Sequence, residues 1–190
     1  MVKSKVQKPL KLVVFDLDET IGAFPALSGV LYAIQPFLQN YPLFKHYLDT
    51  NPTYLRPYIL DILKQVYEAK RVHGLVVVLY TNNSNSFWIS MILYYINTVL
   101  NVKEPIFDHV LDASQHTDYN KNVEDLLRRT RLLNNKGKNA QIFFVDDQYH
   151  PDMITPQTVY FHITPYKTPN ARDVAPSQQL FKELRTFINS

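Results

Sequence analysis

Three short apolar runs that each end abruptly on acidic or small polar residues constrain the fold of this chain most. The runs and the residues that follow them are 12–15 with Asp16 and Asp18, 75–80 with Thr81 and Asn82, and 142–145 with Asp146 and Asp147. Continuous apolar runs of this length are typical of strands buried on both faces, as in a parallel sheet. Open α/β sheets bind ligands beyond the carboxyl ends of their strands, so we expect these polar residues to form a site there.

Helical patterns alternate with apolar runs along the rest of the chain. The further strand candidates are 109–111 and 159–163, and the helix candidates are 56–72, with Pro57 in its first turn, 87–100, 122–133 and 177–188. Strands that alternate with helices predict a doubly wound, Rossmann-like α/β fold with right-handed crossovers. If the chain winds outward from the first strand and then returns to its other side, the three polar strand ends become neighbours, with the switch point at Asp16.

The length of 190 residues favours one compact domain, since domains commonly hold roughly 100–200 residues. Residues 1–10 carry spaced lysines and are expected to form a flexible basic arm. Residues 22–54 contain Pro36, Pro42 and Pro52, which we expect to break this segment into short helices over one end of the sheet. The segment is too short for a large cap domain, but it is long enough for a small helical lid.

Composition excludes several kinds of site. The chain has no cysteine, which rules out disulfides, thiolate zinc sites, iron–sulfur clusters and a cysteine nucleophile. A net charge of +3 is too small to argue for a nucleic-acid partner. No apolar stretch approaches the roughly 20 residues that span a bilayer, and no signal-peptide pattern opens the sequence. We therefore expect an intracellular protein without a membrane partner.

The spacing of Asp16 and Asp18 has a direct chemical consequence. Residues two apart in an extended chain point the same way, so both carboxylates can face one site. Carboxylates crowded together need a cation between them, or one of them must stay protonated. The alternative is a polar turn in which Thr20 caps a helix. The polar ends of two other strands make three unrelated turns a poor explanation.

Taken together, these motifs resemble those of the haloacid dehalogenase (HAD) superfamily. The resemblance rests on Asp16-x-Asp18-x-Thr20 after one strand, Thr81 after another, a later lysine, and Asp146-Asp147 after a third. The resemblance implies a magnesium-dependent phosphatase. The segments 20–55 and 82–121 are each too short for a full cap domain. The resemblance implies that Asp16 is the nucleophile that becomes an aspartyl-phosphate, and that Asp18 is the general acid and then the general base.

The same resemblance implies a ligand set and a phosphate-binding set. Magnesium would be held by Asp16, the carbonyl of Asp18, Asp146, and Asp147 directly or through water. Thr81 would donate to a phosphoryl oxygen. The remaining substrate-binding candidates are Thr20, Asn82 and Arg56, of which Arg56 could instead orient the start of a helix.

The catalytic lysine has three candidates in the sequence. Lys121 lies at the start of the helix before the strand that ends on Asp146, which is the position that the family's lysine takes. Lys136 and Lys138 lie in the loop before that strand, at the end opposite Asp146, so we expect Lys121 to be the catalytic residue. Weaker site candidates are His116 in the loop before Lys121 and His150 at the rim of the site. Trp88 is expected in the core.

Leu55-Arg56-Pro57 further resembles the NLI-interacting-factor-like branch, the FCP/SCP-type phosphatases of the RNA polymerase II C-terminal domain. Stand-alone domains of this kind occur in protists and large DNA viruses, and they imply a cytoplasmic or nuclear location, in the host cell if the protein is viral. The chain departs from the branch in Tyr58, where a glycine is usual, in Asn82 and Asn83 after Thr81, and in its longer segment 22–54.

An uncapped site is open to solvent and can admit the tail of a macromolecule, so the expected substrate is a phosphorylated protein or peptide, with phosphoserine or phosphothreonine. A lid formed by residues 22–54 would favour a small metabolite or a nucleotide instead, and a polynucleotide end is a further alternative. A third class is a non-catalytic binding module with the same fold. Such modules commonly lose a motif acid, whereas this chain has all of them, so we expect activity.

Overall fold

The computed structural model describes residues 9–33, 40–115, 120–133, 139–170, 172 and 174–190. Its centre is a five-stranded sheet with the order β3-β2-β1-β4-β5, in which every neighbouring pair is parallel. The strands are β1 (Lys11–Phe15), β2 (Val76–Tyr80), β3 (His109–Leu111), β4 (Gln141–Asp146) and β5 (Thr158–His162). The order confirms the doubly wound α/β fold, because the chain moves outward from β1 to β3 and then returns to the other side of β1.

The strand register brings the polar strand ends to one level. Phe15, the last residue of β1, pairs with Leu79 on one side and with Val145 on the other. The next residue, Asp16, continues the ladder, because its N–H donates to the carbonyl of Val145 at 2.9 Å. Thr81 likewise extends β2, and its N–H donates to the carbonyl of Leu111 at 2.9 Å. The switch point therefore lies at Asp16, between β1 and β4.

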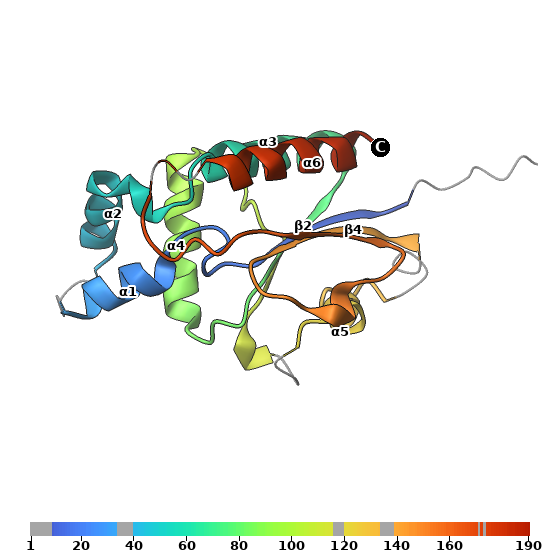
Figure 1. Cartoon of the computed structure of the whole chain (residues 1–190), viewed down its shortest axis with the longest axis horizontal. Coiled ribbons are helices and arrows are strands. Elements are labelled where there is room, and N and C mark those ends of the chain that lie inside the picture. Colours follow the sequence, from blue (N-terminus) through green and yellow to red (C-terminus); the bar gives the residue numbers. More distant parts are fainter. Residues whose placement is uncertain (1–8, 34–39, 116–119, 134–138, 171, 173) are drawn as a thin grey trace, which may run out of the picture.

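Helices cover both faces of the sheet (Figure 1). The helices α3 (Ile59–His73) and α6 (Ala175–Asn189) lie on one face, and α5 (Val123–Arg129) lies on the other. Alternate residues of the central strand point into two separate cores, with Val13 and Phe15 toward α3 and α6, and Leu12 and Val14 toward α5. Burial on both faces explains why the strands read as unbroken apolar runs.

The helix predicted over 56–72 begins later than expected. Its first helical residue is Ile59, and Pro57 precedes the helix rather than occupying its first turn. Tyr58, which caps the helix, has a φ of 61°, a left-handed conformation that a helix cannot continue through. The helix ends at His73 and is capped by Gly74, whose φ of 68° suits glycine. The helix predicted over 122–133 is also shorter, since α5 ends at Arg129.

In its described residues, the segment between β1 and α3 forms two helices and a short 3₁₀ turn. These are α1 (Phe24–Ala33), α2 (Tyr41–Thr50) and η2 (Pro52–Tyr54). Pro42 and Pro52 lie in first turns, so they begin these elements instead of breaking them. Pro36 lies outside the described residues. The role of this segment as a lid stays a prediction.

The helix α2 packs on α4 (Ser86–Val99), which follows β2. The ring of Phe44 meets Trp88 and Tyr95 edge to face, at centroid distances of 5.5 and 6.2 Å. Trp88 is buried, which confirms that it belongs to the core. Within the ranges described, no helix is long and apolar enough to cross a membrane.

Candidate active site

A buried lysine joins two carboxylates at the carboxyl edge of the sheet. Lys121 lies just before α5, and its Nζ donates to Oδ1 of Asp16 at 2.6 Å and to Oδ2 of Asp146 at 2.7 Å. Its side chain is 1% exposed. Burial lowers the pKa of Lys121, but the two carboxylates outweigh that effect and hold its pKa above the ordinary value. The ammonium is therefore fixed between strands β1 and β4.

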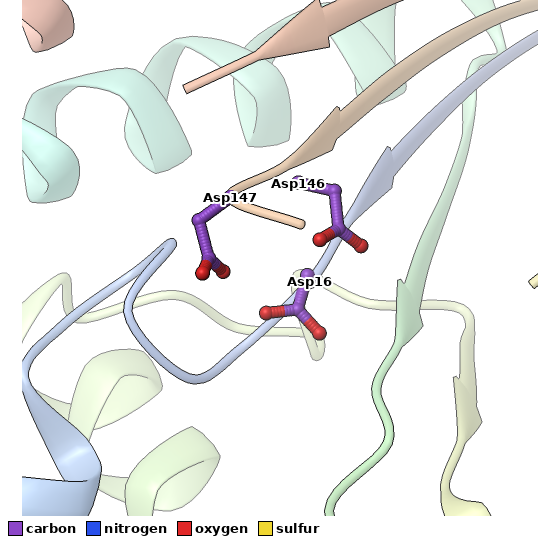
Figure 2. A group of neighbouring side chains, drawn as sticks. All are labelled: Asp16, Asp146 and Asp147. Atoms are coloured by element: carbon purple, nitrogen blue, oxygen red, sulfur yellow. The ribbon is translucent and has the colours of Figure 1, made fainter. Parts of the chain in front are cut away.

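Asp16, Asp146 and Asp147 form a group that could hold a metal ion (Figure 2). All three are buried, and one oxygen from each lies within 4.8 Å of the others. Asp16 follows β1, whereas Asp146 ends β4 and Asp147 follows it. A set of carboxylate oxygens is what magnesium prefers among protein ligands.

The electrostatics of these carboxylates favour a cation. Burial raises the pKa of Asp16 above its ordinary value, and the charge of Asp146 adds to the rise, against the opposing effect of Lys121. Burial also raises the pKa of Asp147 to about 6, with the hydrogen bond from Thr20 opposing and the charge of Asp146 adding. One lysine therefore does not neutralise the cluster. A divalent cation would complete the charge balance that the protein leaves open.

Asp18 has a different environment from its neighbour Asp16. It is half-buried, and its Oδ2 accepts a hydrogen bond from Nδ2 of Asn83 at 2.8 Å. Burial raises the pKa of Asp18, although the bond from Asn83 opposes the rise. A carboxyl with a raised pKa can hold a proton closer to neutral pH, which suits a general acid.

The loop that carries both acids is held in an unusual conformation. Glu19 has a φ of 59°, in the left-handed region that residues other than glycine rarely adopt. Thr20 is fully buried, and its hydroxyl donates to Oδ1 of Asp147 at 3.0 Å and accepts from the N–H of Asp147 at 3.1 Å. Thr20 therefore ties the loop after β1 to the loop after β4, rather than capping a helix.

Arg56 holds the same loop in place through hydrogen bonds to its backbone carbonyls. Its Nε donates to the carbonyl of Thr20 at 2.7 Å, and one terminal nitrogen donates to the carbonyls of Glu19 at 2.5 Å and Thr164 at 2.7 Å. The guanidinium also lies 5.2 Å from the ring centroid of Tyr166. The side chain is buried, so these contacts support an orienting role toward the loop. Arg56 as a substrate-binding residue stays a prediction.

The loop after β2 brings Thr81 and Asn83 to the site. Thr81 is buried, and its hydroxyl accepts from the N–H of Asn83 at 3.2 Å. Asn83, not the neighbouring Asn82 named from the sequence, makes the contact with Asp18. The signal was available, because Thr81 and Asn83 are two residues apart and can point to the same side of an extended chain. Asn82 is half-buried, and its contact with substrate stays a prediction.

His150 lies inside the site rather than at its rim. It is 4% exposed, and its Nε2 lies 3.5 Å from Oδ2 of Asp146. Burial acts to raise the pKa of Asp146, but the contacts with His150 and Lys121 outweigh it and lower that pKa below its ordinary value. The two other lysine candidates, Lys136 and Lys138, and the weaker candidate His116 lie outside the described residues.

Comparisons with known proteins add little beyond this geometry. No protein-family model matches the chain, and no curated protein matches it. Among solved structures, the chain is similar to a HAD-superfamily hydrolase of subfamily IA, variant 1, from Geobacter sulfurreducens. The identity is 16% and the TM-score is 0.42, over 73% of this chain and 80% of that chain. A likeness this distant does not establish a shared activity.

Proposed function

We propose that this protein is a magnesium-dependent phosphomonoester hydrolase of the HAD type that works through an aspartyl-phosphate on Asp16. The observation that carries the proposal is the position of Lys121, whose ammonium bonds both Asp16 and Asp146 beside Asp147. A buried cation that touches a nucleophile and a metal ligand at once is suited to the charge of a transferring phosphoryl group.

The residues present fit the metal that this function requires. Asp16, Asp146 and Asp147 supply hard oxygen ligands close enough to share one ion, and the raised pKa of Asp16 reflects burial and crowding that a cation would relieve. The backbone carbonyl of Asp18 is the further ligand that the resemblance implies. When bound, magnesium would neutralise charge on the phosphate oxygens and on the carboxylates around it.

In the first half-reaction, a carboxylate oxygen of Asp16 attacks the phosphorus and forms the new phosphorus–oxygen bond. The bond between phosphorus and the leaving oxygen breaks, and Asp18 gives its proton to that oxygen. Before substrate binds, Lys121 orients Asp16 through its bond at 2.6 Å. Asn83 holds the acid through its bond to Asp18.

In the second half-reaction, Asp18 is ionised and accepts a proton from water as the water attacks the phosphorus. The bond between phosphorus and Asp16 breaks, which releases inorganic phosphate and restores both acids. Thr81 lies at the end of β2 and would donate to a phosphoryl oxygen during both steps. Thr20 and Arg56 would keep the loop of Asp16 and Asp18 in position throughout.

For the substrate, we propose a phosphorylated protein or peptide that carries phosphoserine or phosphothreonine, as in FCP/SCP-type enzymes. The support is the small size of the segment before α3, whose helix α2 packs on α4 through Phe44 and does not form a separate cap domain. A site without a large cap can accept the flexible tail of another protein.

Hydrolysis of a generic aryl phosphate tests the reaction. The wild-type protein should turn over with magnesium and stop with EDTA, and Asp16→Asn should abolish turnover while the fold is retained. Asp49→Asn is a matched control, because Asp49 lies on α2 in an exposed pair with Lys45. Activity that survives in Asp16→Asn would overturn the aspartyl-phosphate mechanism, and a folded wild-type protein with no turnover would favour a binding module.

A substrate panel tests the substrate class. It contains phosphoserine, phosphothreonine and phosphotyrosine peptides, mononucleotides, sugar phosphates, and oligonucleotides with a terminal phosphate. The proposal expects the highest kcat/KM on the phosphoserine or phosphothreonine peptides. A preference for sugar phosphates or mononucleotides would assign the protein to small-molecule phosphatases, and a preference for oligonucleotide ends would assign it to phosphatases of polynucleotide ends.

A further inference from the structure

Two aromatic rings flank the ammonium of Lys121. The Nζ atom lies 5.7 Å from the ring centroid of Tyr80 and 5.9 Å from that of Phe144. A cation within roughly 6 Å of a ring centroid is attracted by the negative face of the ring. Tyr80 ends β2 and Phe144 belongs to β4, so the rings come from the two strands that flank β1. The same ammonium bonds Asp16 and Asp146.

One of the rings is fixed by the helix that follows the lysine. The hydroxyl of Tyr80 donates to Oδ2 of Asp125 at 3.1 Å, and both groups are buried. Asp125 also forms an ion pair with Arg129 at 2.7 Å, and its N–H is capped by the side chain of Asn122 at 2.7 Å. The first turn of α5, which begins just after Lys121, is therefore anchored to the same tyrosine whose ring meets the ammonium.

The carboxylates that bind Lys121 also act as nucleophile and as metal ligands in the proposed reaction. Asp16 must attack phosphorus, and both Asp16 and Asp146 are cation ligands, so substrate and metal compete with Lys121 for them. A buried ammonium that loses carboxylate partners becomes costly unless other groups stabilise it. An aromatic ring is not a ligand for magnesium, so the rings of Tyr80 and Phe144 are groups near the ammonium that do not compete for the metal.

We propose that Tyr80 and Phe144 are positioning residues that form an aromatic bracket around Lys121 and aim its ammonium at the phosphoryl group of the substrate. This inference rests on the proposed function, because it assigns Lys121 to the phosphate. It adds a role for two core residues that lie outside the sequence motifs.

Calorimetric titration with inorganic phosphate in the presence of magnesium tests the bracket without turnover. The variants are Tyr80→Leu and Phe144→Leu, which remove one ring each, and Tyr80→Phe, which keeps the ring and removes only the bond to Asp125. We expect Tyr80→Leu and Phe144→Leu to bind phosphate about 5- to 30-fold more weakly, the range that a desolvated cation–ring contact supplies. Tyr80→Phe should lie closer to the wild type than Tyr80→Leu does.

Val78→Ala is the matched control for a general loss of packing. Val78 is buried in the same core as Tyr80 and Phe144 and lies two residues before Tyr80 on β2, so it tests the same face of the sheet without a ring at the lysine. It should lower stability and leave phosphate affinity nearly unchanged. If Tyr80→Leu does not fold, Phe144→Leu and Tyr80→Phe carry the test.

Three outcomes distinguish a failure of the aromatic bracket from a failure of the proposed function. Weaker phosphate binding in the ring-deleted variants, with the control unchanged, supports the bracket. Ring-deleted variants that bind phosphate as well as the wild type, in a protein that hydrolyses aryl phosphates, overturn the bracket and leave the proposed function standing. A wild-type protein that neither binds phosphate nor hydrolyses it overturns both.

Discussion

The side-chain amide of Asn83 donates to Asp18 at 2.8 Å and thereby joins the loop after β2 to the loop after β1. This bond stabilises the ionised form of Asp18 and opposes the rise in its pKa that burial causes. In the proposed mechanism, the acid step needs Asp18 protonated and the water step needs it ionised. Asn83 therefore influences the balance between the two half-reactions.

Asn83→Ala should lower kcat/KM and move its alkaline limb to higher pH. Loss of the bond raises the pKa of Asp18, so the protonated acid persists to higher pH. The rate falls because the carboxyl of Asp18 is no longer held in one orientation toward the leaving oxygen. We expect a fall of about 10-fold, part of the roughly 10²–10⁴-fold that acid–base catalysis supplies. A pH–rate profile measures both effects.

Asn85→Ala is the control for that variant, because the side chain of Asn85 caps α4 through the N–H of Trp88 at 3.0 Å. It should cost about 1 kcal/mol of stability and leave the pH limb in place. An unshifted limb in Asn83→Ala would contradict the assigned role of the bond.

Lys121→Met should abolish activity and destabilise the protein. Removing one member of a buried ion-pair set leaves Asp16 and Asp146 without their counter-charge, which typically costs about 3–5 kcal/mol. Urea denaturation without metal measures the loss. Lys45→Met is the comparison, since its pair with Asp49 is exposed and its loss should change stability little. Similar losses in both variants would mean that the buried pairs contribute no more than a surface pair.

Magnesium should stabilise the protein more as pH rises. Asp147 has a pKa raised to about 6, and the pKa of Asp16 is also raised, so both bind protons more tightly when folded than when unfolded. Their contribution to the stability of the metal-free protein is therefore present at low pH and lost as pH rises through the folded-state pKa values. Metal binding needs both groups ionised, so it becomes stronger over the same range.

Thermal unfolding with and without magnesium at about pH 5 and about pH 7.5 measures this coupling. The increase in Tm on adding magnesium should be larger at the higher pH. Asp16→Asn and Asp147→Asn should each reduce the increase. An increase that is the same at both pH values would show that neither carboxylate changes its protonation on metal binding.

His150→Ala should weaken magnesium binding by about 10-fold, the lower end of what loss of a partner behind a metal ligand costs. Its Nε2 lies 3.5 Å from Oδ2 of Asp146, a proposed magnesium ligand, and contributes to the lowered pKa of Asp146. Magnesium titration followed by calorimetry gives the affinity directly. His150→Gln, which keeps a polar group there, should recover part of it, and an unchanged affinity in His150→Ala would rule out a positioning role.

The central fold and most of the site were predictable because their signals are local in the sequence. Unbroken apolar runs report burial on both faces, and the acids that end them must lie at one edge of a parallel sheet. Lys121 was chosen through the resemblance to HAD motifs, and the structure places its ammonium between Asp16 and Asp146. The spacing of Thr81 and Asn83 placed Asn83 on the site's side of the chain, but its partner Asp18 and the backbone partners of Arg56 depend on how distant segments meet in the fold.

The later start of α3 also results from contacts between segments that are distant in the sequence. Helical spacing and Pro57 both favoured an earlier start, but Arg56 is extended toward the carbonyls of the loop after β1 and Tyr58 is left-handed. Tertiary contacts thus decided the boundary over local preference.

Gly22→Ala should destabilise the loop that carries Asp16 and Asp18, by about 1–3 kcal/mol, as overpacking of a filled site does. A Cβ at this position would meet the carbonyl oxygen of Tyr54 at 2.6 Å and the ring of Phe24 at 2.8 Å. The backbone there cannot easily yield, because Gly22 bridges to Asp18 on one side and to Leu55 on the other.

Gly29→Ala is the matched control, since it lies in α1 with no atom within 4 Å of its added Cβ, and there alanine should stabilise by about 0.5–1 kcal/mol. Urea denaturation should therefore show opposite signs for the two substitutions. A destabilised Gly22→Ala that also loses aryl phosphatase activity at temperatures where it is fully folded would show that this contact helps to set the geometry of the two acids, whereas equal effects at both glycines would contradict the close packing at Gly22.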